Sequence, residues 1–355
     1  MILLLLVLVA YLTVEVMLLR TASYGISPCG AAYRPVTVMV AARNEAAHIG
    51  ACIESLLAQR YPAAMVQILI GDDGSEDATA TIIQQYQQVE YHRIESQWPG
   101  LRGKQNVLAH LAHHARNDIF VITDADITHH PDWLAAIVAG FDAPEVGLVT
   151  GGTIVHGNKA FHHMQTYDWL VGVLTIKACD DIGMPITAVG NNMAVTRAAY
   201  RSVGGYEALP FSITEDFLLF KHIRAAGYRY RWLLNPVMLN RSAPMPDFSA
   251  LLHQRKRWYK GGTAGPWYAG AMYFLFAATN PLLVSGVFWL EYGWALVAAK
   301  ILADFLVFAA GFRALGMLRL LRYFPVYVLY HIFTSVALPV YFIMPTRVIW
   351  KGRSY

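Results

Sequence analysis

Long apolar runs stand at both ends of this 355-residue chain, and they constrain its fold more than any other feature. Residues 1–19 are almost uninterruptedly apolar, close to the roughly 20 residues that cross a hydrocarbon core. Three further candidate spans follow at 271–290, 295–312 and 324–344. The first run lacks a basic start and a small-residue cleavage site, so we expect a retained anchor over 1–20 rather than a cleaved signal peptide.

The charges beside these runs leave two topologies open. Arg20 and Arg34 favour a middle region on the inner side of the membrane. Four full spans, including those expected within 270–346, would then return the basic tail at 347–355 to the outside, against the positive-inside tendency. The alternative is that one C-terminal segment lies in the membrane interface or re-enters.

The composition agrees with a membrane protein, since 56% of the residues are hydrophobic and only 15% are charged. The net charge of +4 is spread along the chain. We therefore expect no nucleic-acid partner and favour anionic lipid headgroups instead. The three cysteines lack C-x-x-C spacing, which predicts reduced thiols rather than disulfides or a thiolate metal site.

The middle region, 34–240, alternates strand-like and helix-like segments. Strand-like runs at 36–42, 66–71 and 118–123 are separated by helical patterns. This alternation predicts an α/β domain with parallel strands and helical crossovers. Ligands of such sheets bind beyond the carboxyl ends of the strands, where this chain places acidic residues.

Two acidic motifs follow these strands. In Asp124-Ala125-Asp126, two carboxylates on the same side of an extended backbone could hold one Mg²⁺ or Mn²⁺, together with phosphate oxygens. Asp72 and Asp73 precede Gly-Ser, which fits nucleotide binding and equally a turn followed by a helix N-cap. Strand-end acids also serve as caps and turns, so neither motif identifies a site alone.

Two later motifs are also compatible with chemistry or with structure. Thr214-Glu215-Asp216 opens a helical stretch, where the threonine could cap the helix and the acids could favour its dipole. In the region 241–265, Gln254 and Arg257 share a helical face and Trp258 follows. Arginine binds phosphate through paired hydrogen bonds, but a basic amphipathic helix at the bilayer surface explains the segment equally well.

Taken together, the motifs resemble the membrane-bound inverting family 2 glycosyltransferases with a Q-x-x-R-W signature, which include polysaccharide synthases, ceramide glucosyltransferases and lipid or carotenoid glycosyltransferases. The resemblance implies a GT-A fold, a Rossmann-like nucleotide-diphospho-sugar transferase domain, with flanking transmembrane helices. It rests on six motifs in order: 41–45 (A-A-R-N-E), 72–75 (D-D-G-S), 103–104 (G-K), 124–126 (D-A-D), 214–216 (T-E-D) and 254–258 (Q-R-K-R-W).

The resemblance also implies a role for each matching residue. Asp216 would be the general base and Glu215 would position it, while Asp126 and Asp124 would bind Mg²⁺ or Mn²⁺. Asn192 and Trp258 would contact the acceptor. The donor would be bound by Ala41, Arg43, Glu45, Asp72, Asp73, Lys104, Asp124, Gln254, Arg257 and Trp258.

The implied function is transfer of a sugar from a UDP-sugar, with inversion, to a hydroxyl of a membrane lipid. The implied location is a multi-pass protein of the inner membrane with a cytoplasmic catalytic domain and no obligate protein partner. A processive polysaccharide synthase of the glucan, chitin or hyaluronan type is the alternative, and an inactive scaffold of the same fold is a third. The sequence leaves the donor sugar and the acceptor open.

Overall fold

The structure is a computed structural model that describes residues 1–345, 349–350 and 353–354. Within these residues the chain forms two compact units. The sheet unit comprises Ser27–Ile154 and Thr187–Ala243, and the helical unit comprises Met1–Ile26, Val155–Ile186 and Pro244–Tyr355. The predicted catalytic range, 34–240, therefore includes parts of both units. The predicted basic tail, 347–355, lies partly outside the described residues.

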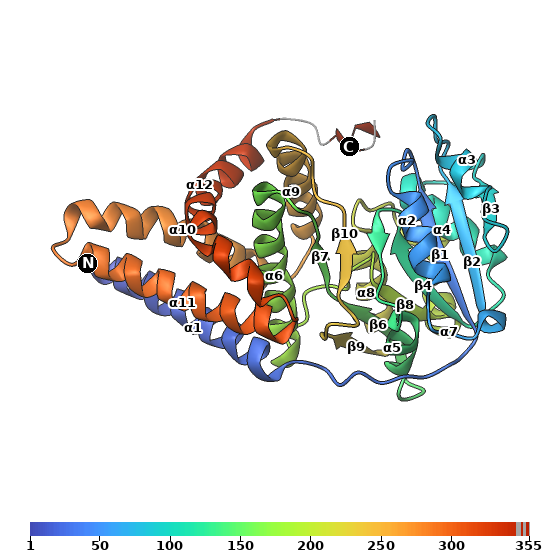
Figure 1. The fold of residues 1–355 in the computed structure, drawn as a ribbon, viewed down its shortest axis with the longest axis horizontal. Helices are drawn as coiled ribbons and strands as arrows, with labels where there is room; N and C mark the ends of the chain where they lie inside the picture. Colours follow the sequence, from blue (N-terminus) through green and yellow to red (C-terminus); the bar gives the residue numbers. More distant parts are fainter. Residues whose placement is uncertain (346–348, 351–352, 355) are drawn as a thin grey trace. The chain divides into compact units, whose positions relative to one another are not determined.

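The sheet unit is built around a mixed sheet with the strand order β3-β2-β1-β4-β8-β6-β9 (Figure 1). β1 pairs in parallel with β2 and with β4, so the two strands that end in acids flank β1 on either side. The strands of this sheet are β1 Val36–Ala42, β2 Val66–Asp72, β3 Glu90–Arg93, β4 Ile119–Asp124, β6 Val146–Gly151, β8 Met193–Thr196 and β9 Arg229–Leu233.

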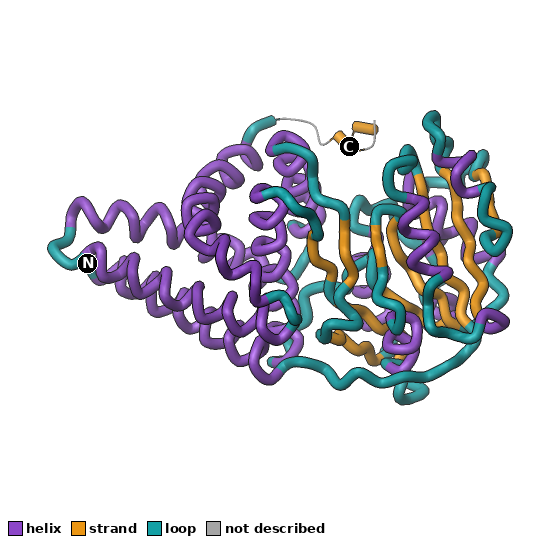
Figure 2. The backbone as a smooth tube through the Cα atoms, in the orientation of Figure 1, coloured by secondary structure: helices purple, strands orange, loops and turns teal. Residues whose placement is uncertain are grey.

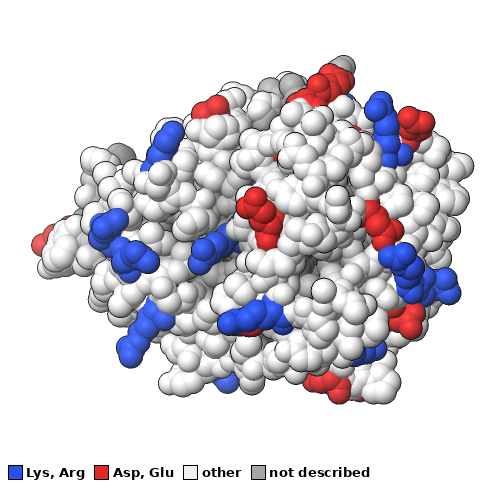
Figure 3. Space-filling view, turned by 45° about the vertical axis from the view of Figure 1, so that its right-hand side comes forward, with Lys and Arg blue, Asp and Glu red and all other residues white. Residues whose placement is uncertain are grey.

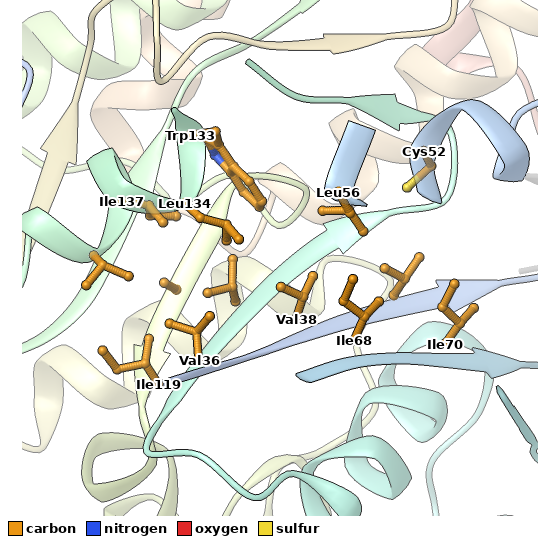
Figure 4. Close-up of a cluster of buried hydrophobic side chains, with 14 of the residues drawn as sticks. Val36, Val38, Cys52, Leu56, Ile68, Ile70, Ile119, Trp133, Leu134 and Ile137 are labelled. Atoms are coloured by element: carbon orange, nitrogen blue, oxygen red, sulfur yellow. The ribbon is translucent and has the colours of Figure 1, made fainter. Parts of the chain in front are cut away.

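Helices cover both faces of this sheet, which explains why β1, β2 and β4 are apolar along almost their whole length. On one face, Val38 and Ile68 pack against Cys52 and Leu56 from one helix and Trp133 from another (Figure 4). A second core lies on the other face. The helices of this unit are α2 Ile49–Leu57, α3 Thr79–Ile83, α4 Gly103–His114, α5 Trp133–Ala139, α7 Arg197–Ser202 and α8 Glu215–Ala225, with the short η1 Ala63–Met65 and η2 Tyr206–Ala208.

The predicted α/β class is confirmed, but the prediction of parallel strands is wrong for β8. This strand runs antiparallel to both β4 and β6. After β6 the chain makes a long excursion and re-enters the sheet at the end where β6 finishes, with Met193 opposite Thr150, so it must run back along the sheet. A smaller sheet of β5 Ile127–Thr128, β10 Asn240–Ser242 and β7 Thr153–Val155 follows the acidic end of β4.

The helical unit contains long helices (Figure 2), several of which are apolar. In the part of the chain that the structure describes, four stretches are long and apolar enough to cross a membrane: Ile2–Tyr24, Trp267–Trp289, Gly293–Ala314 and Leu318–Ile343. All four agree with the spans predicted from the sequence. The elements of this unit are α1 Ile2–Tyr24, α6 Ala160–Asp181, α9 Phe248–Gly262, α10 Trp267–Trp289, α11 Gly293–Ala314, η3 Leu318–Tyr323, α12 Phe324–Ile343, β11 Ile349–Trp350 and β12 Arg353–Ser354.

Polar groups join α1 and α11 inside this unit. Asp304 accepts hydrogen bonds from the Tyr11 hydroxyl at 2.8 Å and from Lys300 at 2.6 Å. Because these groups satisfy one another, the helices can bury them among apolar side chains.

On the face drawn in Figure 3, acidic and basic side chains are interspersed.

Candidate active site

The loops after β1 and β2 are joined by hydrogen bonds at the carboxyl edge of the sheet. Arg43 donates from Nη1 to the carbonyl oxygen of Asp73 at 2.6 Å. Asn44, which has a φ of 52°, donates its backbone N–H to the Ser75 hydroxyl at 3.0 Å. The Glu76 backbone N–H in turn donates to the Asn44 side chain at 2.9 Å. These contacts hold two of the predicted donor-binding residues, Arg43 and Asp73, in a fixed loop pair.

Asp72 has a structural part in the same loop pair. Its buried carboxylate accepts hydrogen bonds from the Ser75 backbone at 2.9 Å, from the Ser75 hydroxyl at 2.5 Å and from the Tyr91 hydroxyl at 3.0 Å. The turn interpretation of D-G-S therefore applies to Asp72. Ala41 and Asp73 stay partly exposed, whereas Glu45 is buried.

The D-A-D motif ends β4, but its backbone differs from the one expected. β4 stops at Asp124, and Ala125 and Asp126 form a turn, so the expectation of an extended backbone across the motif is wrong. Ala125 is buried in the core, while both flanking acids remain partly exposed. The turn thus still leaves both carboxylates accessible.

Lys104 links two of the acidic motifs. Its Nζ lies 2.7 Å from an oxygen of Asp124 and 2.8 Å from an oxygen of Glu215, and it donates to the carbonyl oxygen of Gly190 at 3.3 Å. Burial on its own lowers the pKa of Lys104, but the charges of Asp124, Glu215 and Asp216 outweigh it and raise that pKa above its usual value. Lys104 is therefore a permanent positive charge among three carboxylates.

Asp216 accepts two backbone hydrogen bonds from different segments. Its Oδ2 accepts from the Gly190 N–H and its Oδ1 from the Phe217 N–H, both at 2.8 Å. Burial and the neighbouring charge of Glu215 raise the pKa of Asp216 to about 6, against the opposing effects of Lys104 and the two N–H groups. A carboxylate with this pKa is ionised near neutral pH and can accept a proton.

The local sequence explains this arrangement. Thr214 occupies the N-cap position of α8, but its side chain makes no capping hydrogen bond, so the expectation that it caps the helix is wrong. The acids at the start of α8 face Lys104 instead. Gly190 has to be glycine, because a Cβ there would lie 2.6 Å from the Cβ of Asp216. Such a separation is closer than real Cβ atoms approach.

Gln105 supports the same segment and has no counterpart among the predicted site residues. It is buried, donates to the carbonyl oxygen of Pro210 at 3.1 Å and accepts from the Ser212 backbone at 3.0 Å. Adjacent residues of α4 thus hold the chain that leads into α8. A buried glutamine one position after Lys104 was the available signal, but its distant partners are not visible in the sequence.

Asn192 has a structural role that contradicts its predicted contact with the acceptor. Its side chain is fully buried, and the amide donates to the carbonyl oxygens of Gly152 and Met238, both at 2.6 Å. Its oxygen accepts from the Trp133 indole at 2.8 Å. With these partners the carboxamide fastens neighbouring loops together and is shielded from any ligand.

The Q-R-K-R-W motif lies on α9 of the helical unit. Arg255 forms an ion pair with Asp168 of α6 at 3.3 Å, and its guanidinium lies 4.4 Å from the centre of the Trp258 ring. Trp258 meets Trp169 edge to face, with ring centres 5.0 Å apart. Tyr330 also donates to Asp168 at 2.8 Å. Neither Arg255 nor Asp168 was among the predicted site residues.

Gln254 is buried on the same helix, and its Oε1 has no hydrogen-bond partner within the described residues. A buried and unsatisfied amide oxygen costs free energy unless a ligand or water meets it. Gln254 therefore suits a binding role. The roles predicted for Gln254, Arg257 and Trp258 stay predictions.

The described residues contain no group of three or more histidine, cysteine or acidic side chains that could hold a metal ion. A cation at the D-A-D motif would thus have two carboxylates, Asp124 and Asp126, and oxygens from a ligand. This donor set fits Mg²⁺ or Mn²⁺, which proteins often bind through one or two carboxylates plus substrate phosphates.

Residues 37–203 match the family model described as glycosyl transferase family 2. The chain is 30% identical over 242 residues to a beta-monoglucosyldiacylglycerol synthase from Synechocystis, covering 65% of this chain and 48% of that protein. It is 24% identical over 195 residues to a 4,4'-diaponeurosporenoate glycosyltransferase of Staphylococcus aureus, covering 53% of this chain and 50% of that protein. The chain thus spans about half the length of the curated relatives it matches.

The fold has a solved counterpart. A mannosyltransferase from Pyrobaculum calidifontis, solved with GDP-Man and Mn²⁺, aligns with a TM-score of 0.59 at 21% identity, over 95% of this chain and 92% of the other. This similarity confirms the predicted GT-A fold. The family match confirms the resemblance to family 2 glycosyltransferases over residues 37–203.

Proposed function

We propose that this chain, which carries a glycosyl transferase family 2 domain, transfers a hexose from a UDP-sugar to a hydroxyl group of a membrane lipid, with inversion. One observation carries the proposal. The Lys104 ammonium lies 2.7 Å from Asp124 of the D-A-D motif and 2.8 Å from Glu215 of the T-E-D motif. This single side chain therefore links two motifs that the sequence resemblance treats separately. The lipid acceptor is supported by the printed activities of the relatives and by the long apolar helices.

Asp216 is the proposed general base. The acceptor hydroxyl oxygen attacks the anomeric carbon, the bond from that carbon to the diphosphate oxygen breaks, and the hydroxyl proton passes to Asp216. A pKa of about 6 suits this role, because the carboxylate is ionised near neutral pH yet basic enough to take the proton. A single displacement of this kind inverts the anomeric centre.

Lys104 and Glu215 position this base. The Lys104 charge favours the ionised form of Asp216 despite burial, and the ion pair with Glu215 fixes the first turn of α8. Gly190 sets the direction of the Asp216 carboxylate through its N–H. Lys104, Gly190 and the first turn of α8, which these interactions join, are far apart in the sequence.

Asp124 and Asp126 would hold Mg²⁺ or Mn²⁺. When bound, the cation would neutralise the charge that develops on the departing diphosphate. Arg43, Asp73, Ala41 and Glu45 would border the nucleoside, with Asp72 shaping their loop. We retain as proposals that Gln254, Arg257 and Trp258 bind the donor diphosphate and the acceptor.

We also propose that the sheet unit faces the cytoplasm in an inner membrane. The support is the basic residue Arg20, which lies in α1 a few residues before its end at Tyr24. The orientation agrees with a water-soluble nucleotide donor and a lipid acceptor that meet at one membrane surface.

Purified full-length protein, incubated with a panel of UDP-sugars, a membrane-lipid extract and Mg²⁺ or Mn²⁺, tests the function. We expect a monoglycosylated lipid by mass spectrometry, with an anomeric configuration opposite to that of the donor. The Asp216→Asn variant, in which we expect much slower transfer, is the matched control. A high polymer in place of the glycolipid would identify a processive synthase, and no sugar transfer with any donor would contradict the proposal.

A further inference from the structure

We infer that α12 lies along the membrane interface, with an apolar stripe against the lipid acyl chains, and does not cross the bilayer. Its length does not decide the question, because 20 residues of helix span roughly 30 Å, enough for either arrangement. The contacts at the two ends of α12 decide it, and all of these contacts lie within the helical unit.

The hairpin of α10 and α11 provides the reference. These antiparallel helices are joined by a short turn at Leu290–Tyr292, which we call the far end. The opposite end, where α10 begins at Trp267 and α11 stops at Ala314, is the near end. α9, with the Q-R-K-R-W motif, precedes α10 and so joins the hairpin at the near end.

Both ends of α12 contact the half of this hairpin that includes the near end. At its start, the Phe324 ring centre lies 5.4 Å from that of Phe305 and 6.1 Å from that of Phe308, in the second half of α11. At its finish, Phe342 lies 5.9 Å from Tyr273, in the first part of α10. A helix that crossed the bilayer would finish beside the far end. Figure 1 likewise shows α12 running across the bundle that α1, α10 and α11 form.

α12 also runs beside α9, which cannot enter the hydrocarbon. Residues 255–260 of α9 include four basic side chains, and burying such charges in lipid is costly. Phe333 of α12 contacts Phe248 at the start of α9, with ring centres 5.5 Å apart. Near the other end, Lys256 donates to the carbonyl oxygens of Tyr341 at 3.1 Å and Met344 at 2.5 Å. From Phe333 onward, α12 therefore runs beside a surface helix.

The two faces of α12 have the polarity that a lipid-facing helix requires. The protein-facing side buries Tyr327, Thr334 and Ser335. The outward side carries large apolar residues at alternating intervals of three and four, which forms one continuous helical stripe. Each is between 48% and 83% exposed: Val326, Leu329, Phe333, Val336, Val340 and Ile343. Acyl chains are the occupant that this stripe fits, because it is continuous with a bundle of membrane helices.

Basic side chains immediately before α12 suit contact with anionic lipid headgroups, and an interfacial α12 also removes the conflict between four spans and the positive-inside tendency. Arg319 and Arg322 are exposed on η3, immediately before α12, where they can reach anionic phosphates. With α12 in the interface, α1, α10 and α11 are the helices of the described residues that cross. The end of α12 then stays on the same side as Arg20, which is the outcome that the positive-inside tendency favours for the basic sequence that follows.

Cysteine labelling of the full chain tests the inference without depending on sugar transfer. The native reference is Cys29, which is exposed, whereas Cys52 and Cys179 are buried. In a Cys29→Ser background, we expect Arg319→Cys and Met344→Cys to react with a membrane-impermeant maleimide from the side on which Cys29 reacts. Glu291→Cys, in the far-end turn, is the matched control and should react only from the opposite side. Labelling of Met344→Cys from the Glu291 side would overturn the inference.

Nitroxide labels on the stripe provide a second measurement. In the Cys29→Ser background, labels at Val326, Phe333 and Val340 should have similar shallow depths in vesicles of phosphatidylglycerol and phosphatidylethanolamine, with strong relaxation by oxygen. A crossing helix would place Phe333 deepest, and this result would refute the inference. Weak relaxation by oxygen at all three positions would indicate a protein partner or second copy on the stripe, and would also refute it.

Discussion

Gly190→Ala should displace the proposed base without touching the nucleotide loops. The added Cβ would lie 2.6 Å from the Asp216 Cβ and 2.7 Å from its Oδ2, so the carboxylate must move. The movement breaks the 2.8 Å hydrogen bond from the Gly190 N–H. A hydrogen bond to a charged group contributes about 1.5–3 kcal/mol, which corresponds to a rate loss of about 10- to 150-fold.

The assay for this variant is the rate of glycolipid formation at saturating donor, with donor affinity measured separately by calorimetry. We expect a lower kcat and nearly unchanged donor affinity. The acidic limb of the pH–rate profile should shift to higher pH, because the Gly190 N–H holds the pKa of Asp216 down and its loss raises that pKa. Gly172→Ala is the control, since a Cβ there meets no atom within 4 Å. A Gly190→Ala variant as active as the wild type would refute the reasoning.

Three further predictions concern other groups of the site. A base must be deprotonated to act, and the pKa of Asp216 is about 6, so the transfer rate should rise with pH through that value and be roughly tenfold lower at pH 5 than at its plateau. In Lys104→Met the whole pH–rate profile should shift to higher pH, and measured pH–rate profiles test both expectations. Asp168→Asn should reduce kcat/KM about tenfold, because it loses the ion pair that holds Arg255 over the Trp258 ring, and should change the tryptophan fluorescence. Unchanged kinetics and emission would contradict this. Asp126→Ala should weaken Mn²⁺ binding, measured by electron paramagnetic resonance, and abolish turnover, whereas undiminished Mn²⁺-dependent turnover would exclude Asp126 as a ligand.

The fold class was predictable because its signals are local. Val36–Ala42 and Ile119–Asp124 are apolar runs of strand length, and both faces of their sheet are covered by helices, as their composition indicates. The direction of β8 was not predictable, since the alternation of side chains along Met193–Thr196 is the same in either direction. Its orientation follows from the long excursion that precedes it.

The site was predictable only in part. The acids were found because strand ends and helix starts are local features, whereas the ion pairs of Lys104 with Asp124 and Glu215 join positions that no spacing rule connects. Asn192 was misassigned because a buried asparagine that binds backbone carbonyls has the same sequence signal as one that binds a ligand. The membrane position of α12 likewise depends on contacts, since hydropathy alone describes it as a span.

Asp216→Asn tests the central claim most directly, because it removes the proposed base while keeping the volume of the side chain. We expect the purified variant to bind the UDP-sugar and Mn²⁺ as the wild type does and to form glycolipid about 100- to 10,000-fold more slowly, the range that general-base catalysis contributes. Glycolipid formation by this variant at the wild-type rate would contradict the account.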